Sequence, residues 1–458
     1  MINKKDYFNK IEWLIAHLLV FSIPFQARII LFSWGESFNE WRSSFLYATD
    51  VLLALLLLFW FIRFLAGDSK KIGGLRISDY LLIGFIIVSA ISISGASIKG
   101  LALFRLIKLI EFSAIFWYFR SSISKIFELG TILKTIVWAG LIQAVVAVVQ
   151  FILQSNIGYG LKYLGETILL PKMDGVATFL ADGTLMMRSY GTTPHPNVLA
   201  SFLLFSIFSF FIVYFYRDGI RPHIKDTWQY ALLLIGFFLT FSRAPIAILF
   251  LAQFSHSWSM ILFKKFWLSS VKMIPRVMTI SLVTILTVIA FSLLFYPEVS
   301  SRLNLSRNEQ AVTLRVQYNE IGAEAISKNL FTGVGIGNSV SYLMDQSQYS
   351  NFPEWMFQPV HNLYILVGME TGILGMILFI SFIGMIIWEF IKETSLKKVY
   401  HISFLVMFLS LILISLFDHL FWTIQQGGLI FWLSASFLAS YYRVKIPIKY
   451  SESGQAIS

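Results

Sequence analysis

A histidine at the start of a long apolar run is the residue best suited to acid–base chemistry in this chain. His361 follows Pro359 and precedes Gly368, Gly372 and Gly375. Because the residue before a proline avoids helical geometry, we expect a helix that begins next to His361 and carries the three glycines on the same face. Glycines there would let another helix pack closely. Such a histidine can remove a proton from a hydroxyl group; the alternative is a buried histidine at a lipid–water boundary.

An arginine lies in the short turn between two apolar runs. Arg243 stands in Thr-Phe-Ser-Arg-Ala-Pro, with apolar residues continuing on both sides. If the two runs span a membrane, so short a turn lies below the surface, where irregular backbone is tolerated only beside a cavity. An arginine at that depth is costly unless it meets an anion, which makes Arg243 a candidate site residue. The alternative is a side chain that extends to the lipid headgroups.

Two further basic residues are predicted to lie within a membrane helix. Arg105, Lys108 and Glu111 follow one another at three-residue spacing, which places them on one side of one helix. Charges at that depth face a bundle interior or a water-filled cleft, so Arg105 and Lys108 are candidate substrate-binding residues. The alternative is an internal ion pair of Lys108 with Glu111, or of either base with Glu370.

The polar segment 297–360 is predicted to contain an amphipathic helix from Thr313 to Lys328, because apolar residues recur there at helical spacing. Arg315 falls near its start and is a candidate site residue. Thr-Gly-Val-Gly-Ile-Gly-Asn follows at 332–338. No Lys-Ser/Thr pair comes after these glycines, so a close-approach turn is a better interpretation than a phosphate loop.

The smaller polar segment, 154–196, ends in a second group of candidates. Arg188 is followed by Gly-Thr-Thr-Pro-His-Pro-Asn at 191–197. The two prolines around His195 predict a turn at a helix start, with Asn197 as the N-cap. Arg188 is a candidate substrate-binding residue. His195 is either a second acid–base group or a residue that stabilises the turn.

Composition places these residues in a polytopic membrane protein. Hydrophobic residues make up 57 % of the 458 positions and charged residues only 13 %, about half of what a soluble domain carries. The class predicted is all-α, one integral membrane unit over residues 1–458. Twelve apolar runs long enough to span a bilayer are expected near 12–32, 46–66, 78–95, 101–119, 131–153, 197–216, 226–241, 244–262, 275–296, 361–390, 400–417 and 424–441. Only the segments 154–196 and 297–360 form large loops.

The lysines and arginines predict the orientation. With the N-terminus inside, every inside segment holds at least three of these residues, whereas the segment 418–424 outside holds none. Both termini are therefore expected in the cytoplasm and both large loops outside. This distribution explains the net charge of +11 without a nucleic-acid partner. The polar start of the chain, with no small-residue cleavage site after the first run, predicts a retained first helix.

The residue types available restrict the chemistry. The chain has no cysteine, no Asp-x-Asp, no clustered metal ligands, no serine nucleophile elbow and no Walker loop. Arginines bind phosphates through paired hydrogen bonds and stay charged. Several arginines and one histidine on the outer side therefore suit a lipid-linked pyrophosphate, whose departure they can assist by neutralising charge. We expect no cofactor and no metal.

The motifs resemble those of the O-antigen ligase/O-antigen polymerase superfamily of bacterial envelope glycosyltransferases. His361-Asn362, nine residues, Gly372, two residues and Gly375 fit the ligase signature. Ser-Arg at 242–243 and Arg315 with the glycine pair at 333 and 335 match further family positions, as does Gly-Thr-x-x-His-Pro-Asn-x-x-Ala at 191–200. The resemblance covers the whole chain in topology and 190–380 in motifs. It departs at Leu330, where a proline commonly precedes the glycine run.

The resemblance implies metal-independent, inverting transfer of a glycan from undecaprenyl pyrophosphate to an acceptor at the outer face of the bacterial inner membrane. It implies that Arg243 and Arg315 hold the pyrophosphate, with Arg105 or Lys108 secondary. His361 would be the general base or orient the acceptor, next to Asn362. A ligase would use lipid A-core or another surface acceptor; a polymerase would join lipid-linked repeat units. Membrane lipids are the other expected partners.

Two different functions remain open at this point. A lipid-linked oligosaccharide flippase or other transporter would show internal symmetry and charges through the membrane midplane, and the sequence shows neither two matching broken helices nor such a lane of charges. A peptidoglycan polymerase of the rod-shape/division type would rely on an acidic residue in the large loop, for which Glu320 and Glu324 are the candidates.

Overall fold

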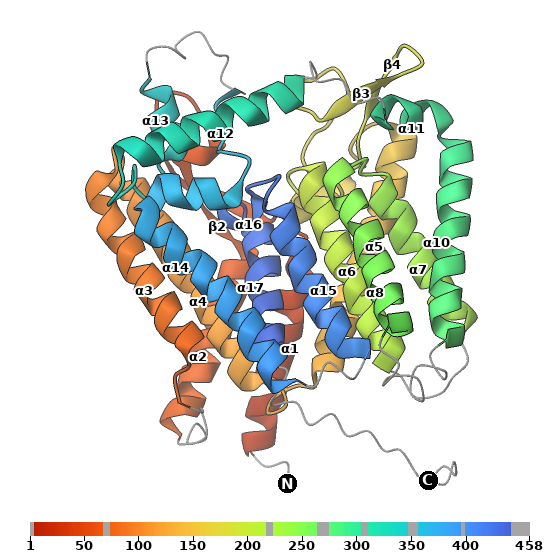
Figure 1. Ribbon diagram of the computed structural model, residues 1–458, viewed down its shortest axis with the longest axis horizontal. Helices are drawn as coiled ribbons and strands as arrows, with labels where there is room; N and C mark the ends of the chain where they lie inside the picture. The colour runs from red at the N-terminus through yellow and green to blue at the C-terminus, as the bar shows by residue number, and fades with distance from the viewer. Residues whose placement is uncertain are drawn as a thin grey trace.

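The structure, a computed structural model, describes residues 4–66, 74–216, 223–262, 274–303, 310–346, 356–394 and 399–440. It is a bundle of long helices with shorter elements gathered at one end (Figure 1). Each predicted apolar run contains a helix, and these are α1 (Lys4–Ser22), α2 (Ala48–Leu65), α3 (Ile77–Ile91), α4 (Lys99–Ser122), α5 (Leu129–Leu153), α6 (Pro196–Tyr216), α7 (Ile224–Phe238), α8 (Arg243–Leu262), α10 (Ile274–Leu294), α14 (Leu363–Glu393), α15 (Val399–Ile414) and α17 (Gln425–Ser440).

Six helices in the described residues are long and apolar enough to cross a membrane by length and composition. They are α2, α3 with the 3-10 turn η2 (Ser92–Gly95), α5, α6, α10 and α14. The side chains of α6 are buried along nearly its whole length, whereas α2 and α10 expose most of theirs. A central helix surrounded by helices with apolar outer faces is the arrangement expected of a protein embedded in lipid.

The all-α prediction needs two corrections. The first run, predicted to span 12–32, ends its helix at Ser22, and residues 28–33 form a strand instead. This strand, β1 (Arg28–Ser33), pairs antiparallel with β2 (Ser43–Tyr47). Pro24 lies between helix and strand; proline cannot donate to the helix ladder, so the helix ends before it. A second hairpin joins β3 (Thr178–Ala181) to β4 (Thr184–Met187).

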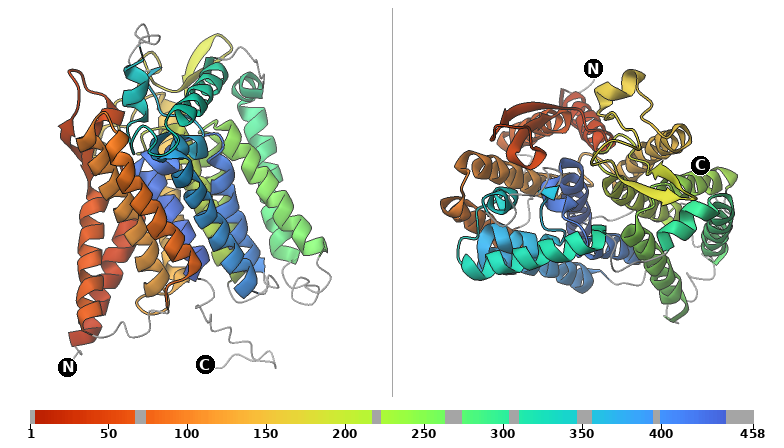
Figure 2. Two further views of the ribbon diagram at one scale, coloured as in Figure 1. Left: turned by 60° about the vertical axis from the view of Figure 1, so that its left-hand side comes forward. Right: turned by 90° about the horizontal axis from the view of Figure 1, so that it is seen from above.

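Short elements cover one end of the bundle, where both hairpins also lie (Figures 1 and 2). They are η1 (Glu40–Arg42), η3 (Tyr159–Leu164), α11 (Tyr296–Leu303), α12 (Gln310–Lys328), α13 (Ser339–Met344) and α16 (Leu420–Thr423). The segment predicted as an amphipathic helix, Thr313 to Lys328, lies within α12. Its Tyr318, Ile321 and Ala325 are buried, whereas Val316 is exposed.

The helix α14 is interrupted at Gly372, where the sequence predicted a continuous glycine face. Gly372 has φ +77° and ψ 175°, a conformation open mainly to glycine. The break leaves backbone N–H and carbonyl groups of α14 without partners in the helix, and the segment around the glycine run forms hydrogen bonds with them. Ile373 N–H donates to the carbonyl of Leu330 (2.9 Å), and Val334 N–H donates to the carbonyl of Met369 (2.9 Å). The glycine run therefore inserts against α14, and this fixes the position of the segment that links α12 to α13.

Buried glutamines of α5 hold the segment that leads into α6. The side-chain amide of Gln150 donates to the carbonyl of Gly191 and to Glu166 (both 2.8 Å), and its oxygen accepts from Gly191 N–H (2.8 Å). Gln143 bonds Thr192 in the same way, through Oγ1 at 2.8 Å and N–H at 2.9 Å. A buried amide that satisfies backbone groups fixes a loop as firmly as secondary structure does. The residues around 188–193 are thereby positioned by the bundle itself.

Candidate active site

A large cavity lies at the capped end of the bundle, with a volume of about 710 Å³. Its walls come from the loop before α6, the start of α8, the helix α12, the segment before α14 and the α15–α16 connection. Five of the predicted site residues line this one cavity: Arg188, His195, Arg243, Arg315 and His361.

Arg188 is buried and fixes the turn that carries Arg243. Its Nε donates to the carbonyl of Thr240 (2.7 Å), and its Nη2 donates to Asn197 Oδ1 (2.8 Å) and to Ser242 Oγ (2.7 Å). Since α7 ends at Phe238 and α8 begins at Arg243, Arg188 ties the short turn between the two helices to the start of α6. This arginine therefore positions its neighbours.

The cavity wall has an excess of positive charge. Its cationic side chains are Arg188, Arg243, Arg302, Arg315 and Lys172, and its carboxylates are Glu40, Asp174 and Asp418. Burial, and next the charges of Arg302, Arg315 and Arg243, lower the pKa of Arg188 to about 9. The contribution of the three arginines reflects repulsion between the cations. An anion bound between them would relieve that repulsion.

His361 lies in the wall between aromatic rings. The phenol ring of Tyr318 stacks on it, with centroids 5.6 Å apart and planes 11° from parallel, and the ring of His419 meets it at 83° with centroids 4.9 Å apart. Its Nδ1 is buried and has no hydrogen-bond partner in the described part of the chain. Burial lowers the pKa of His361 to about 3, with His419 adding to this effect and Asp418 opposing it. The imidazole is therefore neutral at pH 7.

A carboxylate stands beside the two histidines. Asp418 precedes His419 and accepts a hydrogen bond from Asn197 Nδ2 (2.7 Å). Burial acts to raise the pKa of Asp418, but the electrostatic interactions with His419, His361 and Arg315 outweigh this effect and lower the pKa to about 2. An ionised carboxylate here stabilises positive charge on a neighbouring imidazole ring.

His195 has a clear structural task. Its Nδ1 accepts a hydrogen bond from Asn197 N–H (3.1 Å), so its Nε2 carries the proton of the neutral ring. Burial, and next the charge of Arg188, lower the pKa of His195 to about 3. The predicted turn at the helix start is present. Asn197, expected as the N-cap, instead lies in the first turn of α6 and bridges Arg188 and Asp418 with its side chain.

Asn362 is the N-cap of α14. Its Oδ1 accepts from Tyr364 N–H (3.0 Å) and Ile365 N–H (3.2 Å), the usual geometry for a residue that starts a helix. Its side chain thereby anchors the backbone next to His361. The sequence analysis predicted Asn362 to be a substrate-binding residue. In the structure, its Oδ1 instead accepts hydrogen bonds from the first turn of α14.

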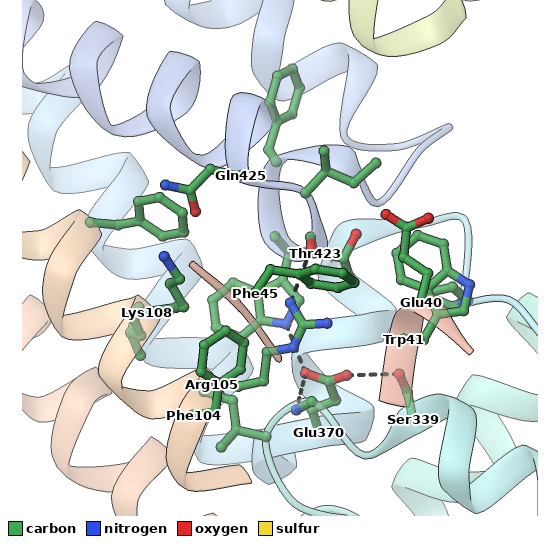
Figure 3. Close-up of a pocket in the computed structure, with 18 of the residues that line it drawn as sticks. Glu40, Trp41, Phe45, Phe104, Arg105, Lys108, Ser339, Glu370, Thr423 and Gln425 are labelled. Carbon is green, nitrogen blue, oxygen red and sulfur yellow. Dashed lines mark hydrogen bonds between the residues drawn. The ribbon is translucent and has the colours of Figure 1, made fainter. Parts of the chain in front are cut away.

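Arg105 and Lys108 line a second, smaller cavity together with Glu370 (Figure 3). Lys108 is paired with Asp50 (2.5 Å) and Glu111 (3.0 Å), which is the internal ion pair that the spacing allowed. The guanidinium of Arg105 donates to the carbonyl of Thr423 (3.1 Å). The two cavities share the wall residues Glu40, Trp41 and Ile424, so the second cavity adjoins the first.

Three residues of the large cavity were missed by the sequence analysis, namely Arg302, Asp418 and His419. For Asp418 and His419 a signal existed, because two titratable residues stand side by side in a very short connection between apolar runs. Arg302 offered none, since it is one of several charges in a polar loop. Only the fold of α11 brings it to the cavity.

One comparison with known proteins gives a family match. Residues 229–380 match the family model Wzy_C, described as O-Antigen ligase, and this stretch contains Arg243, Arg315 and His361. A search of curated proteins found no match. The matched stretch runs from α7 into α14 and thus includes three of the elements that carry the cavity. By this match, residues 229–380 are similar to the O-antigen ligase family.

Proposed function

We propose that the protein transfers a glycan from undecaprenyl pyrophosphate to a hydroxyl group of an acceptor. The observation that carries this proposal is the single cavity that holds four arginines, a neutral histidine and a carboxylate. A pyrophosphate is the substrate group that this excess of positive charge fits. The match of residues 229–380 to the O-antigen ligase family supports a lipid-linked glycan as the substrate.

The arginines have different roles at the pyrophosphate. Arg243, at the first residue of α8, and Arg315, on α12, approach the cavity from two elements and form the clamp. Arg302 contributes charge from α11, and Arg188 holds the α7–α8 turn in place. Positive groups placed where negative charge develops lower the barrier to departure of the leaving group.

In the proposed step, the acceptor oxygen attacks the anomeric carbon of the donor from the face opposite the pyrophosphate. A new C–O bond forms as the bond between the anomeric carbon and the phosphate oxygen breaks, so the configuration inverts. The electron pair of the broken bond leaves with the undecaprenyl pyrophosphate, whose charge Arg243 and Arg315 balance. The proton of the acceptor hydroxyl passes to the imidazole of His361.

His361 suits the role of general base because it is neutral and its Nδ1 has no partner among the described residues. Once it accepts the proton, the nearby carboxylate of Asp418 stabilises the imidazolium. The pyrophosphate acts in the same direction when bound, because its negative charge raises the proton affinity of the ring. His361 is therefore neutral before the donor binds and more basic afterwards.

We also propose that all twelve long helices span the inner membrane, with both termini in the cytoplasm and the cavity on the periplasmic side. The segments that the sequence predicts to be cytoplasmic hold most of the lysines and arginines. In Figure 1, α1 begins and α17 ends at the side of the bundle opposite α12. A lipid-linked donor would then enter from the outer leaflet.

A peptidoglycan-type polymerase fits the structure less well. Glu320 is exposed, and neither Glu320 nor Glu324 lines the cavity. Glu324 pairs instead with Lys328 on the same helix (2.6 Å). The acidic residues in the cavity wall come from other segments.

A reconstituted transfer assay tests the proposal. The full-length protein in nanodiscs receives an undecaprenyl-pyrophosphate glycan in the presence of EDTA, with lipid A-core or with no acceptor. Product on lipid A-core, lost in Arg243→Ala, Arg315→Ala and His361→Ala, is the result expected of a ligase. A lengthened lipid-linked glycan without added acceptor would make the protein a polymerase. Transfer that the three variants retain would refute the site.

A further inference from the structure

The second cavity differs in character from the first. Its lining is largely aromatic, and the rings are those of Trp41, Phe45, Tyr47, Phe104, Phe112, Phe421, Trp422 and Trp432. The centres of water molecules can occupy about 50 Å³ of it, enough for roughly four waters. A site of this size admits one ring-sized group and no extended chain.

The charges in this cavity are balanced. Two cations, Arg105 and Lys108, face two carboxylates, Glu40 and Glu370. Lys108 is already neutralised by Asp50 and Glu111. A phosphate or pyrophosphate would therefore find no surplus of positive charge here, in contrast to the large cavity. This argues against the secondary phosphate-binding role that the sequence suggested for Arg105 and Lys108.

Arg105 nevertheless presents hydrogen-bond donors to the cavity. Figure 3 shows its guanidinium between Thr423 and Glu370. Of its five N–H groups, one bonds the carbonyl of Thr423, and no other hydrogen bond or ion pair is formed with the described residues. The carboxylate of Glu370 is occupied by Gly337 N–H (2.8 Å), Ser339 Oγ (2.7 Å) and Trp422 Nε1 (2.8 Å). The free donors of Arg105 are thus directed to a ligand.

An aromatic wall with a few fixed polar groups suits a sugar ring. The C–H face of a pyranose packs on an aromatic ring, while its hydroxyl groups accept hydrogen bonds from a guanidinium or an amide. Gln425 adds an acceptor instead, because its Nε2 donates to Asp50 Oδ1 (2.6 Å) and Thr49 Oγ1 (3.2 Å), which leaves its Oε1 to accept from a sugar hydroxyl. Phe104 supplies a ring directly beside Arg105.

The position of the cavity connects it with the reaction. Trp41 lies in the wall shared by both cavities and meets His419 edge-to-face, with centroids 5.2 Å apart. His419 in turn contacts His361 at 4.9 Å. The second cavity is thus two ring contacts from the proposed base, about the reach of a sugar joined to the reacting group.

We propose that this second cavity binds one sugar ring of the glycan substrate, through the donors of Arg105 and the face of Phe104. The proposal rests on the proposed function, and it assigns to the enzyme a sugar-recognition site separate from the pyrophosphate clamp. The ring belongs either to the donor glycan or to the acceptor. In the first case a free sugar competes with the donor, and in the second it competes with the acceptor.

The test compares two inhibitors of transfer by the full-length protein in nanodiscs. One is the oligosaccharide released by mild acid from the donor, without lipid or phosphate; the other is inorganic pyrophosphate. Arg105→Met and Phe104→Leu should each weaken inhibition by the oligosaccharide about tenfold and leave that by pyrophosphate unchanged. Ile107→Ala, on the exposed face of the same helix, is the control and should alter neither. Competition with donor or with acceptor identifies the source of the ring.

The opposite pattern would overturn the proposal: pyrophosphate inhibition weakened by Arg105→Met, or oligosaccharide inhibition unchanged in both variants. Thermal unfolding of each variant shows whether it folds. If Arg105→Met does not fold, Phe104→Leu still tests the proposal, because it removes only an aromatic face. Should the wild-type protein transfer no glycan, calorimetric titration with the same oligosaccharide still decides. Binding weakened by Arg105→Met would support the sugar site without the transferase, and no binding to wild type would refute it.

Discussion

The imidazole of His361 meets the ring of His419 edge-to-face, with centroids 4.9 Å apart. One residue precedes α14 and the other follows α15, so the contact joins two helical segments in the wall of the large cavity. Asp418 adjoins this pair and is linked through Asn197 to Arg188. The proposed base and the arginine cluster therefore belong to one connected network.

Replacing His361 should abolish most of the activity without unfolding the protein. His361→Ala removes the proton acceptor, and loss of a general base costs about 10²–10⁴-fold in turnover. The KM for the donor should change little, because the arginines remain. Steady-state kinetics in nanodiscs measure both. A strongly raised donor KM with unchanged turnover would show that His361 binds the donor instead.

Replacing Arg315 should weaken the grip on the pyrophosphate. Arg315→Ala should lower kcat/KM for the donor by about 10²-fold, and Arg315→Lys should restore only part of it, because lysine lacks the paired donors of a guanidinium. The control is Lys328→Ala. Lys328 is an exposed cation on the same helix, and it forms an ion pair with Glu324. Full activity in Arg315→Lys would contradict this account, because it would show that the charge alone suffices.

The buried histidines should make the protein less stable in mild acid. The folded-state pKa of His195 is lowered to about 3, from an ordinary value of 6.5. Between these values the unfolded chain binds a proton that the folded chain does not, so stability falls as pH drops below 6.5. For His195 the loss is about 2 kcal/mol at pH 5.

A variant separates His195 from the other acid-sensitive groups. His195→Asn retains an acceptor for Asn197 N–H but does not titrate. Between pH 7 and pH 5, the free energy of unfolding of this variant should therefore fall by about 2 kcal/mol less than that of the wild type. Unfolding followed at both pH values measures the difference. Parallel losses in the two proteins would mean that His195 keeps its ordinary pKa.

The break in α14 should depend on glycine at one position. A Cβ on Gly372 would lie 2.5 Å from the carbonyl oxygen of Phe331, and the residue has φ +77°. Gly372→Ala should therefore destabilise the protein by several kcal/mol, on the order of 3. Gly384→Ala in the same helix is the matched control; its Cβ would meet nothing within 4 Å, and it should be neutral or about 1 kcal/mol stabilising. Thermal unfolding that ranks the two equally would contradict this account of the break.

Much of this fold follows from the order of apolar runs, because the length and hydrophobicity of a run are local properties. Every predicted run contains a helix, and the predicted loop helix is present as α12. The β1–β2 hairpin was missed because the apolar residues from Arg28 to Ser33 continue the hydrophobic pattern of the helix before them. Only the pairing with Ser43–Tyr47, which a periodicity does not reveal, makes them a strand.

Site residues could be predicted where a charged side chain stands at a position in the sequence that makes its charge costly. A charged residue in a short turn between apolar runs is costly, and this alone singled out Arg243. The kink at Gly372 was not predictable, since glycines on a helix face also indicate close helix packing. Likewise, the separation of Arg105 from Arg243 into two cavities depends on η1 and α16, which lie far from both in sequence.

The position of the bound pyrophosphate tests the central claim most directly. A cryo-electron microscopy map of the full-length protein in nanodiscs with undecaprenyl pyrophosphate would show it. We predict the phosphates between Arg243 and Arg315, with oxygens about 3 Å from both guanidinium groups, and with His361 at the open side of the cavity. Phosphate density beside Arg105 and Lys108, with the large cavity empty, would contradict the account.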